Sequence, residues 1–160
     1  MQIARFSVSN TIAAAVGSVI GGLLADRFGI RKMLAFVYAL TTVPALYLAI
    51  QISASGLTSV PLELFYGAIM LHGLIFGAAF GMHAAVFMGL TNPVVAATQF
   101  TAFMGMTNLA VVIANYWQGM VGERIDYAMV LYLDSLFVVV PLAIIPFLKS
   151  REEQAAVASW

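Results

Sequence analysis

The stretch LELFYGAIMLHGLIFGAAFGMHAAVFMGL, residues 62–90, decides the class of fold. Its only charged side chain is Glu63, at the second position. A transmembrane helix needs roughly 20 mostly apolar residues, so this stretch is long enough to cross a bilayer. The apolar residues are continuous and do not alternate with polar ones, which favours a helix over a barrel strand. A helix also bonds its backbone groups within one segment, as lipid requires.

Four further apolar segments flank this stretch, at residues 3–25, 33–52, 96–121 and 127–147. Short connections with helix breakers separate the segments, at residues 26–32, 53–61, 91–95 and 122–126. The predicted fold is therefore an all-α integral membrane protein with five transmembrane helices. The helices form one partial bundle within residues 1–149, and a cytoplasmic tail follows at residues 150–160.

The composition also indicates a membrane protein. The 160 residues are 62% hydrophobic and 9% charged, against about 45–50% and about 25% in a soluble domain. Seven basic residues balance seven acidic ones, which argues against nucleic acid as a partner. Cysteine is absent, so a disulfide framework, a thiol nucleophile and a cysteine zinc site are excluded.

The basic residues predict how the chain lies in the membrane. Those of the first connection and of the tail fall on one side, namely Arg27, Arg31, Lys32, Lys149 and Arg151. The opposite side has only Arg124, beside Glu123 and Asp126. Because basic residues collect on the cytoplasmic side, we expect a cytoplasmic C-terminus and an outward N-terminus. A first span that starts outside without an export device suggests that the chain belongs to a longer protein.

The first connection carries a motif, Gly22-Leu-Leu-Ala-Asp26-Arg27-Phe-Gly29-Ile-Arg31-Lys32. Physically it is a short basic turn in which Gly29 permits a tight backbone and Gly22 permits close approach of another helix. The motif resembles the Gly-x-x-x-Asp-Arg-x-Gly-basic-basic signature of the major facilitator superfamily. Ile30 departs from that pattern, since a basic residue often stands there.

A second stretch, Gly89-Leu-Thr-Asn92-Pro93-Val-Val-Ala-Ala-Thr98-Gln99-Phe100-Thr101, is followed by Asn108-Leu109. It is similar to the AmpG-like branch of that superfamily, which includes muropeptide permeases and the acetyl-CoA transporter group. The resemblance implies helices 8–12 of 12, the C-terminal half of a proton-coupled carrier that works by alternating access.

The resemblance also implies the surroundings of the protein. The implied location is the bacterial inner membrane, and the implied partners are the bilayer, the missing N-terminal half, protons and a small polar solute. A muropeptide or another polar metabolite is the expected solute. No cofactor, metal or enzymatic activity is expected.

Two histidines, His72 and His83, lie in the third segment. Eleven positions put them on one helix face, about 16 Å apart along the axis, too far to bind one metal ion. They predict either a proton or solute path or hydrogen bonds between helices. Glycines at every fourth position of this segment, Gly73, Gly77 and Gly81, predict a packing stripe. Gly17 and Gly21 predict the same in the first segment.

Polar residues of the fourth segment, Thr101, Asn108 and Asn115, recur every seven residues and form one line, which Gln118 is expected to extend. Their amides can line a solute cavity or bond to other helices. Thr98 and Gln99, at the start of the segment, are expected to cap the helix or to bond between helices.

Two charged residues complete the set of candidates. Arg5 stands near an outer helix end, where it can bind an anion or, as we favour, extend its side chain to the interface. Asp134 lies about 10 Å inside the outer end of the fifth segment. A lone carboxylate there is costly, so Asp134 is either a coupling-proton site or, as we favour, bonded to a structural partner.

Three functions fit these features. The leading one is membrane transport by half of a secondary carrier. The alternative is a non-transporting assembly partner or a degenerate transporter fragment. An intramembrane enzyme using His72, His83 and Asp134 is the third, but the sequence has no nucleophile motif, metal-ligand spacing or phosphate loop to support it.

Overall fold

The structure is a computed structural model that describes residues 2–147, with side chains from Arg5 onward. The predicted cytoplasmic tail at residues 150–160 lies outside the described residues. Four long helices come first: α1 (Gln2–Phe28), α2 (Ile30–Ser55), α3 (Leu62–Leu90) and α4 (Ala96–Arg124). The last span consists of α5 (Tyr127–Phe137), α6 (Val139–Ile144) and a 3-10 turn (Ile145–Phe147). Two more 3-10 turns, Leu57–Ser59 and Pro93–Val95, lie in connections.

The described residues form helices and no strand, and five of the helical segments are long and apolar enough to cross a membrane. These segments are Arg5–Phe28, Ile30–Ser55, Leu62–Leu90, Pro93–Arg124 and Tyr127–Phe147. The predictions of an all-α fold and of five segments long and apolar enough to cross a membrane are confirmed.

The first connection is much shorter than predicted. We expected a loop over residues 26–32, but α1 continues to Phe28 and α2 starts at Ile30, so that Gly29 alone separates them. Gly29 has a φ of 90°, a backbone conformation that a residue with a side chain rarely adopts. One glycine therefore reverses the chain, and the charged residues of the motif lie on the last turn of α1 and the first turn of α2.

The last span is interrupted where proline removes a hydrogen-bond donor. Pro141 has no backbone N–H to bond to the carbonyl of Phe137, four residues earlier, and α5 ends at Phe137. The chain resumes as the short helix α6 and then tightens into the 3-10 turn that contains Pro146. The span keeps its predicted length but is not one continuous helix.

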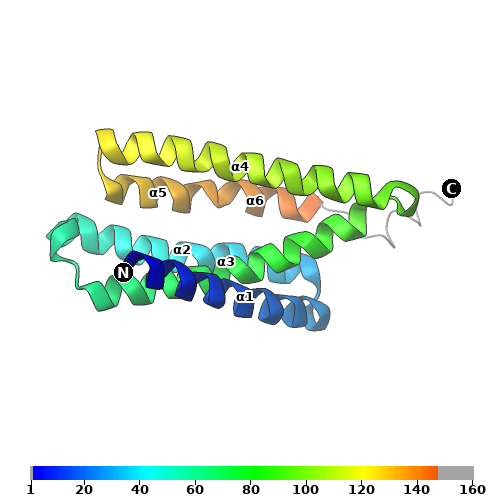
Figure 1. Cartoon of the computed structure of the whole chain (residues 1–160), viewed down its shortest axis with the longest axis horizontal. Coiled ribbons are helices and arrows are strands. Elements are labelled where there is room, and N and C mark those ends of the chain that lie inside the picture. The colour runs from blue at the N-terminus through cyan, green and yellow to red at the C-terminus, as the bar shows by residue number, and fades with distance from the viewer. Residues whose placement is uncertain (1, 148–160) are drawn as a thin grey trace.

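Figure 1 shows two layers of helices, with α1, α2 and α3 in one and α4, α5 and α6 in the other. Within the first layer α1 lies along α3, and α2 packs against both. The layers meet mainly where α2 contacts α5. Successive spans run in opposite directions, so the α1–α2 and α3–α4 connections lie at the same end of the bundle.

Small residues set the contact between α1 and α3. A Cβ added at Gly77 would overlap the backbone of Ala14, and one added at Gly17 would overlap the backbone of Leu74. The glycine stripes of the two helices therefore form a packing surface, as predicted. The expected close approach at Gly22 is wrong, since a Cβ there would meet no atom within 4 Å. Its neighbour Gly21 makes the close approach instead, against Ala78.

The apolar core lies among α1, α2 and α3. Met82 is fully buried at its centre, and Leu34, Val37 and Ile75 surround it. Ile145, at the end of the last span, closes the core from the second layer. In contrast, no residue in the most apolar window of the fourth span is buried. The fourth span thus adds little to the core and leaves most of its surface uncovered.

Candidate functional site

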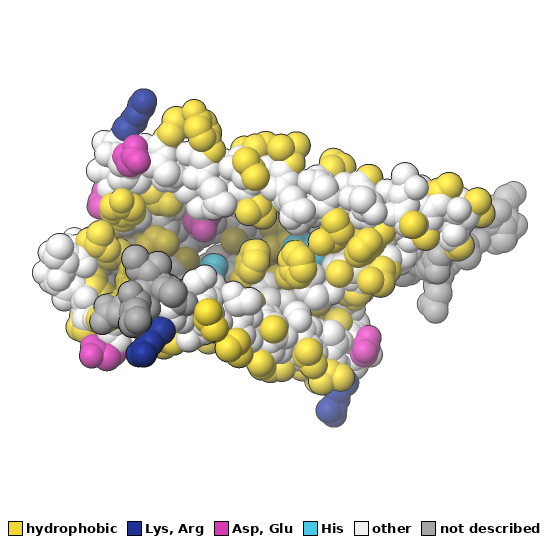
Figure 2. Space-filling model, viewed as in Figure 1, with side chains coloured by type: hydrophobic (Ala, Val, Ile, Leu, Met, Phe, Trp, Pro, Cys, Tyr) yellow, Lys and Arg dark blue, Asp and Glu magenta, His cyan; other side chains and the backbone are white. Residues whose placement is uncertain are grey.

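Polar side chains from four helices gather inside the bundle. The amide nitrogen Nε2 of Gln118 on α4 donates to Oδ1 of Asp134 on α5 at 2.7 Å. His72 on α3 interacts electrostatically with Asp134 and hydrogen-bonds to the backbone of Thr41 on α2. We call these four residues the polar cluster. Figure 2 shows histidine and acidic side chains in a hollow between the two layers.

The polar cluster lies deep inside the membrane-spanning helices. By helix rise, Asp134 lies about 10 Å and His72 about 15 Å from the first residues of their helices, well inside the spans. A carboxylate at such a depth needs a partner, because hydrocarbon cannot solvate it. Gln118 supplies the structural partner that we expected for Asp134. The arrangement places a carboxylate and an imidazole, two ionisable groups, in one part of the bundle.

The second histidine lies in a different place. The hydroxyl of Tyr38 on α2 and Nε2 of His83 form a hydrogen bond. The ring of His83 stacks on Phe87, and Phe87 stacks on Phe103 of α4 at 5.2 Å between ring centroids. We call these four residues the aromatic row. It connects α2, α3 and α4.

Both histidines therefore bond to α2, which is one of the two arrangements that the sequence left open. They lie in separate groups, as their predicted 16 Å spacing requires. Among the described residues, no group of three or more His, Cys, Asp and Glu side chains is placed to hold a metal ion.

Several predicted site residues lie elsewhere. Arg5 is exposed near the start of α1, and Asn108 and Asn115 are exposed on α4. The expectation that Gln118 extends the asparagine line is wrong. Three residues beyond Asn115, it is turned about 60° around the helix and points to α5.

Gln99 does not cap α4, whose N-cap residue Val95 makes no side-chain cap hydrogen bond, but bonds to the turn before the helix. Its side-chain oxygen Oε1 accepts a hydrogen bond from the backbone N–H of Asn92 at 2.7 Å. The side chain of Asn92 in turn accepts from the backbone N–H of Val94 at 3.0 Å. These bonds fix the turn between α3 and α4, and Thr98 beside them is exposed.

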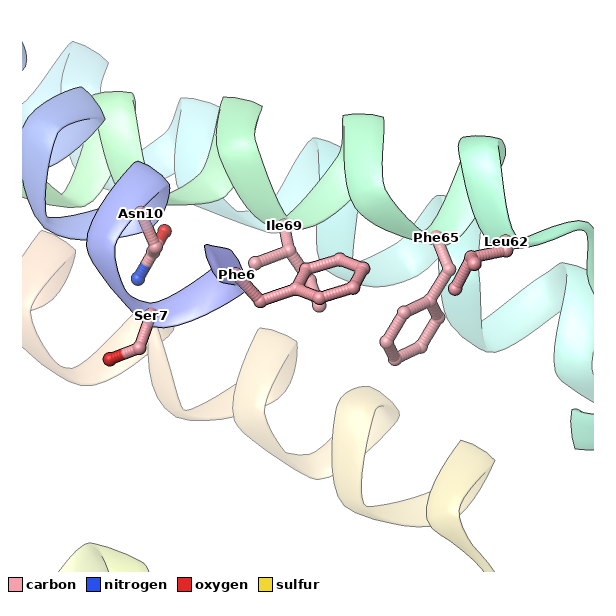
Figure 3. A pocket seen from close by; sticks show the side chains of 6 residues that line it. All are labelled: Phe6, Ser7, Asn10, Leu62, Phe65 and Ile69. Atoms are coloured by element: carbon pink, nitrogen blue, oxygen red, sulfur yellow. The ribbon is translucent and has the colours of Figure 1, made fainter. Parts of the chain in front are cut away.

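A pocket of about 440 Å³ lies between the first turns of α1 and α3. Figure 3 shows its lining side chains, Phe6, Ser7, Asn10, Leu62, Phe65 and Ile69. The lining is mainly apolar. The side-chain oxygen of Asn10 is buried without a hydrogen-bond partner, beside Gly73. This pocket could not be predicted from the sequence, because it arises where two segments that are distant along the chain approach each other.

The fold and the polar cluster together define an all-helical membrane protein with ionisable groups inside its bundle. Comparisons with models of known protein families, with curated proteins and with solved structures find no match.

Proposed function

We propose that this chain is the C-terminal half-bundle of a secondary active, proton-coupled solute carrier that works by alternating access. The polar cluster is the observation that carries the proposal. Ionisable groups within transmembrane segments are rare and costly, and they commonly mark ion pathways and proton relays. Here a carboxylate and an imidazole from different helices lie within electrostatic range, inside an otherwise apolar bundle.

The polar cluster has the parts that proton coupling needs. Asp134 can accept a proton, and protonation removes the negative charge through which the carboxylate interacts with its neighbours. The imidazole of His72 can hold a proton on a ring nitrogen, so His72 is the second ionisable group of the polar cluster. Gln118 holds the carboxylate through the amide at 2.7 Å. Because the groups come from α3, α4 and α5, a change of charge alters contacts between three helices.

The turn between α1 and α2 supports the proposed family, the AmpG-like branch of the major facilitator superfamily. The motif residues Asp26 and Arg27 end α1, and Arg31 and Lys32 begin α2. The φ of 90° at Gly29 explains why the motif needs glycine there. On this proposal the five spans are helices 8–12 of a twelve-helix carrier.

The proposed solute site lies between two half-bundles, since carriers of this superfamily bind solutes at the interface of their repeats. The N-terminal half would supply the opposite wall. A muropeptide or another polar metabolite is the proposed solute class. The chain alone is then expected to insert into the membrane and fold, but not to transport the solute.

Uptake of a radiolabelled anhydromuropeptide tests this proposal. Cells would express the chain with or without a separately encoded N-terminal part that supplies the other seven helices, 1–7. We expect uptake only with both halves, and we expect a protonophore to abolish accumulation. Asp134→Asn should abolish accumulation but leave exchange down a concentration gradient, because it removes the proton site and keeps the hydrogen-bonding shape.

The matched control is Asp126→Asn, which neutralises an exposed carboxylate just before α5 and should leave accumulation unchanged. Uptake by the isolated chain would contradict the half-bundle proposal. Absence of uptake with both halves present at the membrane would contradict transport of this solute class. In that case, a defined complex on a native gel would favour a non-transporting assembly partner.

A further inference from the structure

The end of the bundle at which α1 meets α2 carries an excess of basic side chains. Three basic residues and one acidic residue lie close together there, namely Asp26, Arg27, Arg31 and Lys32. The described charged residues near the opposite end are two basic and three acidic, namely Arg5, Arg124, Glu63, Glu123 and Asp126. Figure 2 shows a basic side chain projecting from the surface where the first layer ends at the lower right. The bundle therefore has one end with a net positive charge.

The length of α1 places this basic end at the level of the lipid headgroups. The candidate span Arg5–Phe28 has 24 residues, which extend about 36 Å at a rise of 1.5 Å per residue. The hydrocarbon core of a bilayer is about 30 Å thick, so the last turn of α1 reaches the headgroup layer. Because Gly29 alone separates α1 from α2, Lys32 on the first turn of α2 lies at a similar depth. Arg27 and Lys32 are thus held at the depth of the lipid phosphates.

The side chains at this turn combine two cations with an apolar ring. Arg27 and Lys32 are both exposed, and Phe28 has 54% of its surface accessible. The guanidinium carbon of Arg27 lies 5.5 Å from the centroid of the Phe28 ring. The guanidinium presents a planar fork of donors that matches two oxygens of a phosphate, and the Lys32 ammonium adds a compact positive charge. Phosphate oxygens and hydrocarbon can therefore be bound next to each other here.

We propose that Arg27 and Lys32 bind the phosphate of an anionic phospholipid, with Phe28 against the first part of its acyl chains. Charge complementarity supports this partner, since basic residues next to a transmembrane helix attract anionic lipids. A zwitterionic phospholipid carries its own cation, which offsets its phosphate. The site therefore prefers phosphatidylglycerol to phosphatidylcholine.

Two features of this turn distinguish a lipid from a free phosphate ion. Its depth puts it where phospholipid headgroups are concentrated, and the exposed ring of Phe28 offers nothing to an ion without acyl chains. The lipid site does not depend on the transport proposal, because it rests on the charge, exposure and depth of this turn alone.

Native mass spectrometry of the full chain in detergent tests this inference, and insertion orientation does not affect the measurement. The chain would be mixed with equal amounts of phosphatidylglycerol and phosphatidylcholine that have identical acyl chains. We expect the phosphatidylglycerol adduct to predominate. Arg27→Gln should lower the ratio of the two adducts about fivefold, and Arg27→Gln with Lys32→Gln about twentyfold, as expected for two basic residues near a lipid surface. Both side chains are exposed, so the fold is retained.

The matched control is Arg124→Gln, which removes an exposed basic residue at the opposite end and should leave the adduct ratio unchanged. Arg27→Lys keeps the charge but loses the planar fork, so it should lower the ratio less than Arg27→Gln does. Equal adducts of the two lipids on the unmodified chain, or an equal loss with Arg124→Gln, would overturn the proposal. Displacement of phosphatidylglycerol by an equal concentration of inorganic phosphate would also overturn it, because the site would then be one for the free ion.

Discussion

The missing side chain of Gly77 determines how closely α1 and α3 can pack. A Cβ at this position would overlap the carbonyl of Ala14, which belongs to the backbone and cannot rotate away. Gly77→Ala should therefore lower the free energy of unfolding in mild detergent by about 1–3 kcal/mol, the usual cost of overpacking. Gly67→Ala, on the same helix with open space around it, is the control. It should be neutral or stabilise by up to about 1 kcal/mol, since alanine favours helices. Equal losses for both variants would argue against the α1–α3 contact.

Only some contacts of the individual site residues could be predicted from the sequence. Spacing alone was enough to keep His72 and His83 apart, because helix rise is fixed. It also put Asn108 and Asn115 on one face. The partners of Asp134 could not be predicted, since the bond to Gln118 depends on how α4 is rotated against α5. Rotation about a helix axis follows from packing across the whole contact, and a single sequence does not encode it locally.

Pro141 breaks the last span and so determines whether that span is one continuous helix. Pro141→Ala restores the N–H that can bond to the carbonyl of Phe137, so α5 and α6 should merge into one helix. We expect the free energy of unfolding to rise by about 1–3 kcal/mol, towards the cost of an interior proline. Slow hydrogen exchange of the new amide at position 141 would show the restored bond. Pro61→Ala, before the first turn of α3, should give no gain. Fast exchange at position 141 would show that the break has another cause.

At the level of elements, the predicted spans match the helices because hydropathy is a local property. The helix ends were harder to predict. Residues 26–32 are polar enough to read as a loop, but charged side chains can extend from helix ends into water. The helices therefore continue until Gly29, where the positive φ ends α1. The break at Phe137 could be predicted only by considering that Pro141 removes the hydrogen bond to the carbonyl four residues before it.

For the whole molecule, the arrangement of the helices bears on how the proposed carrier is completed. The helices form two layers, and α4 lies at the edge of the second layer, away from α1, α2 and α3, with most of its residues exposed. A two-fold axis along the membrane normal would bring two half-bundles together with the same orientation. The two halves of a carrier in the proposed superfamily are related by an axis of the same direction. The proposed carrier therefore requires that every copy of the chain inserts the same way.

Orientation can be measured with single cysteines at the two ends of the bundle. Val94→Cys marks the α3–α4 connection, at the end that also carries Arg27 and Lys32. Ile125→Cys marks the opposite end, where Arg124 stands beside acidic residues. Both positions are exposed, with 88% and 65% of their surface accessible. Because basic connections stay in the cytoplasm, an impermeant maleimide should label Ile125→Cys in intact spheroplasts and Val94→Cys only after permeabilisation. The reverse pattern would place the N-terminus inside. Labelling of both in intact spheroplasts would mean mixed orientation, which the proposed carrier does not allow.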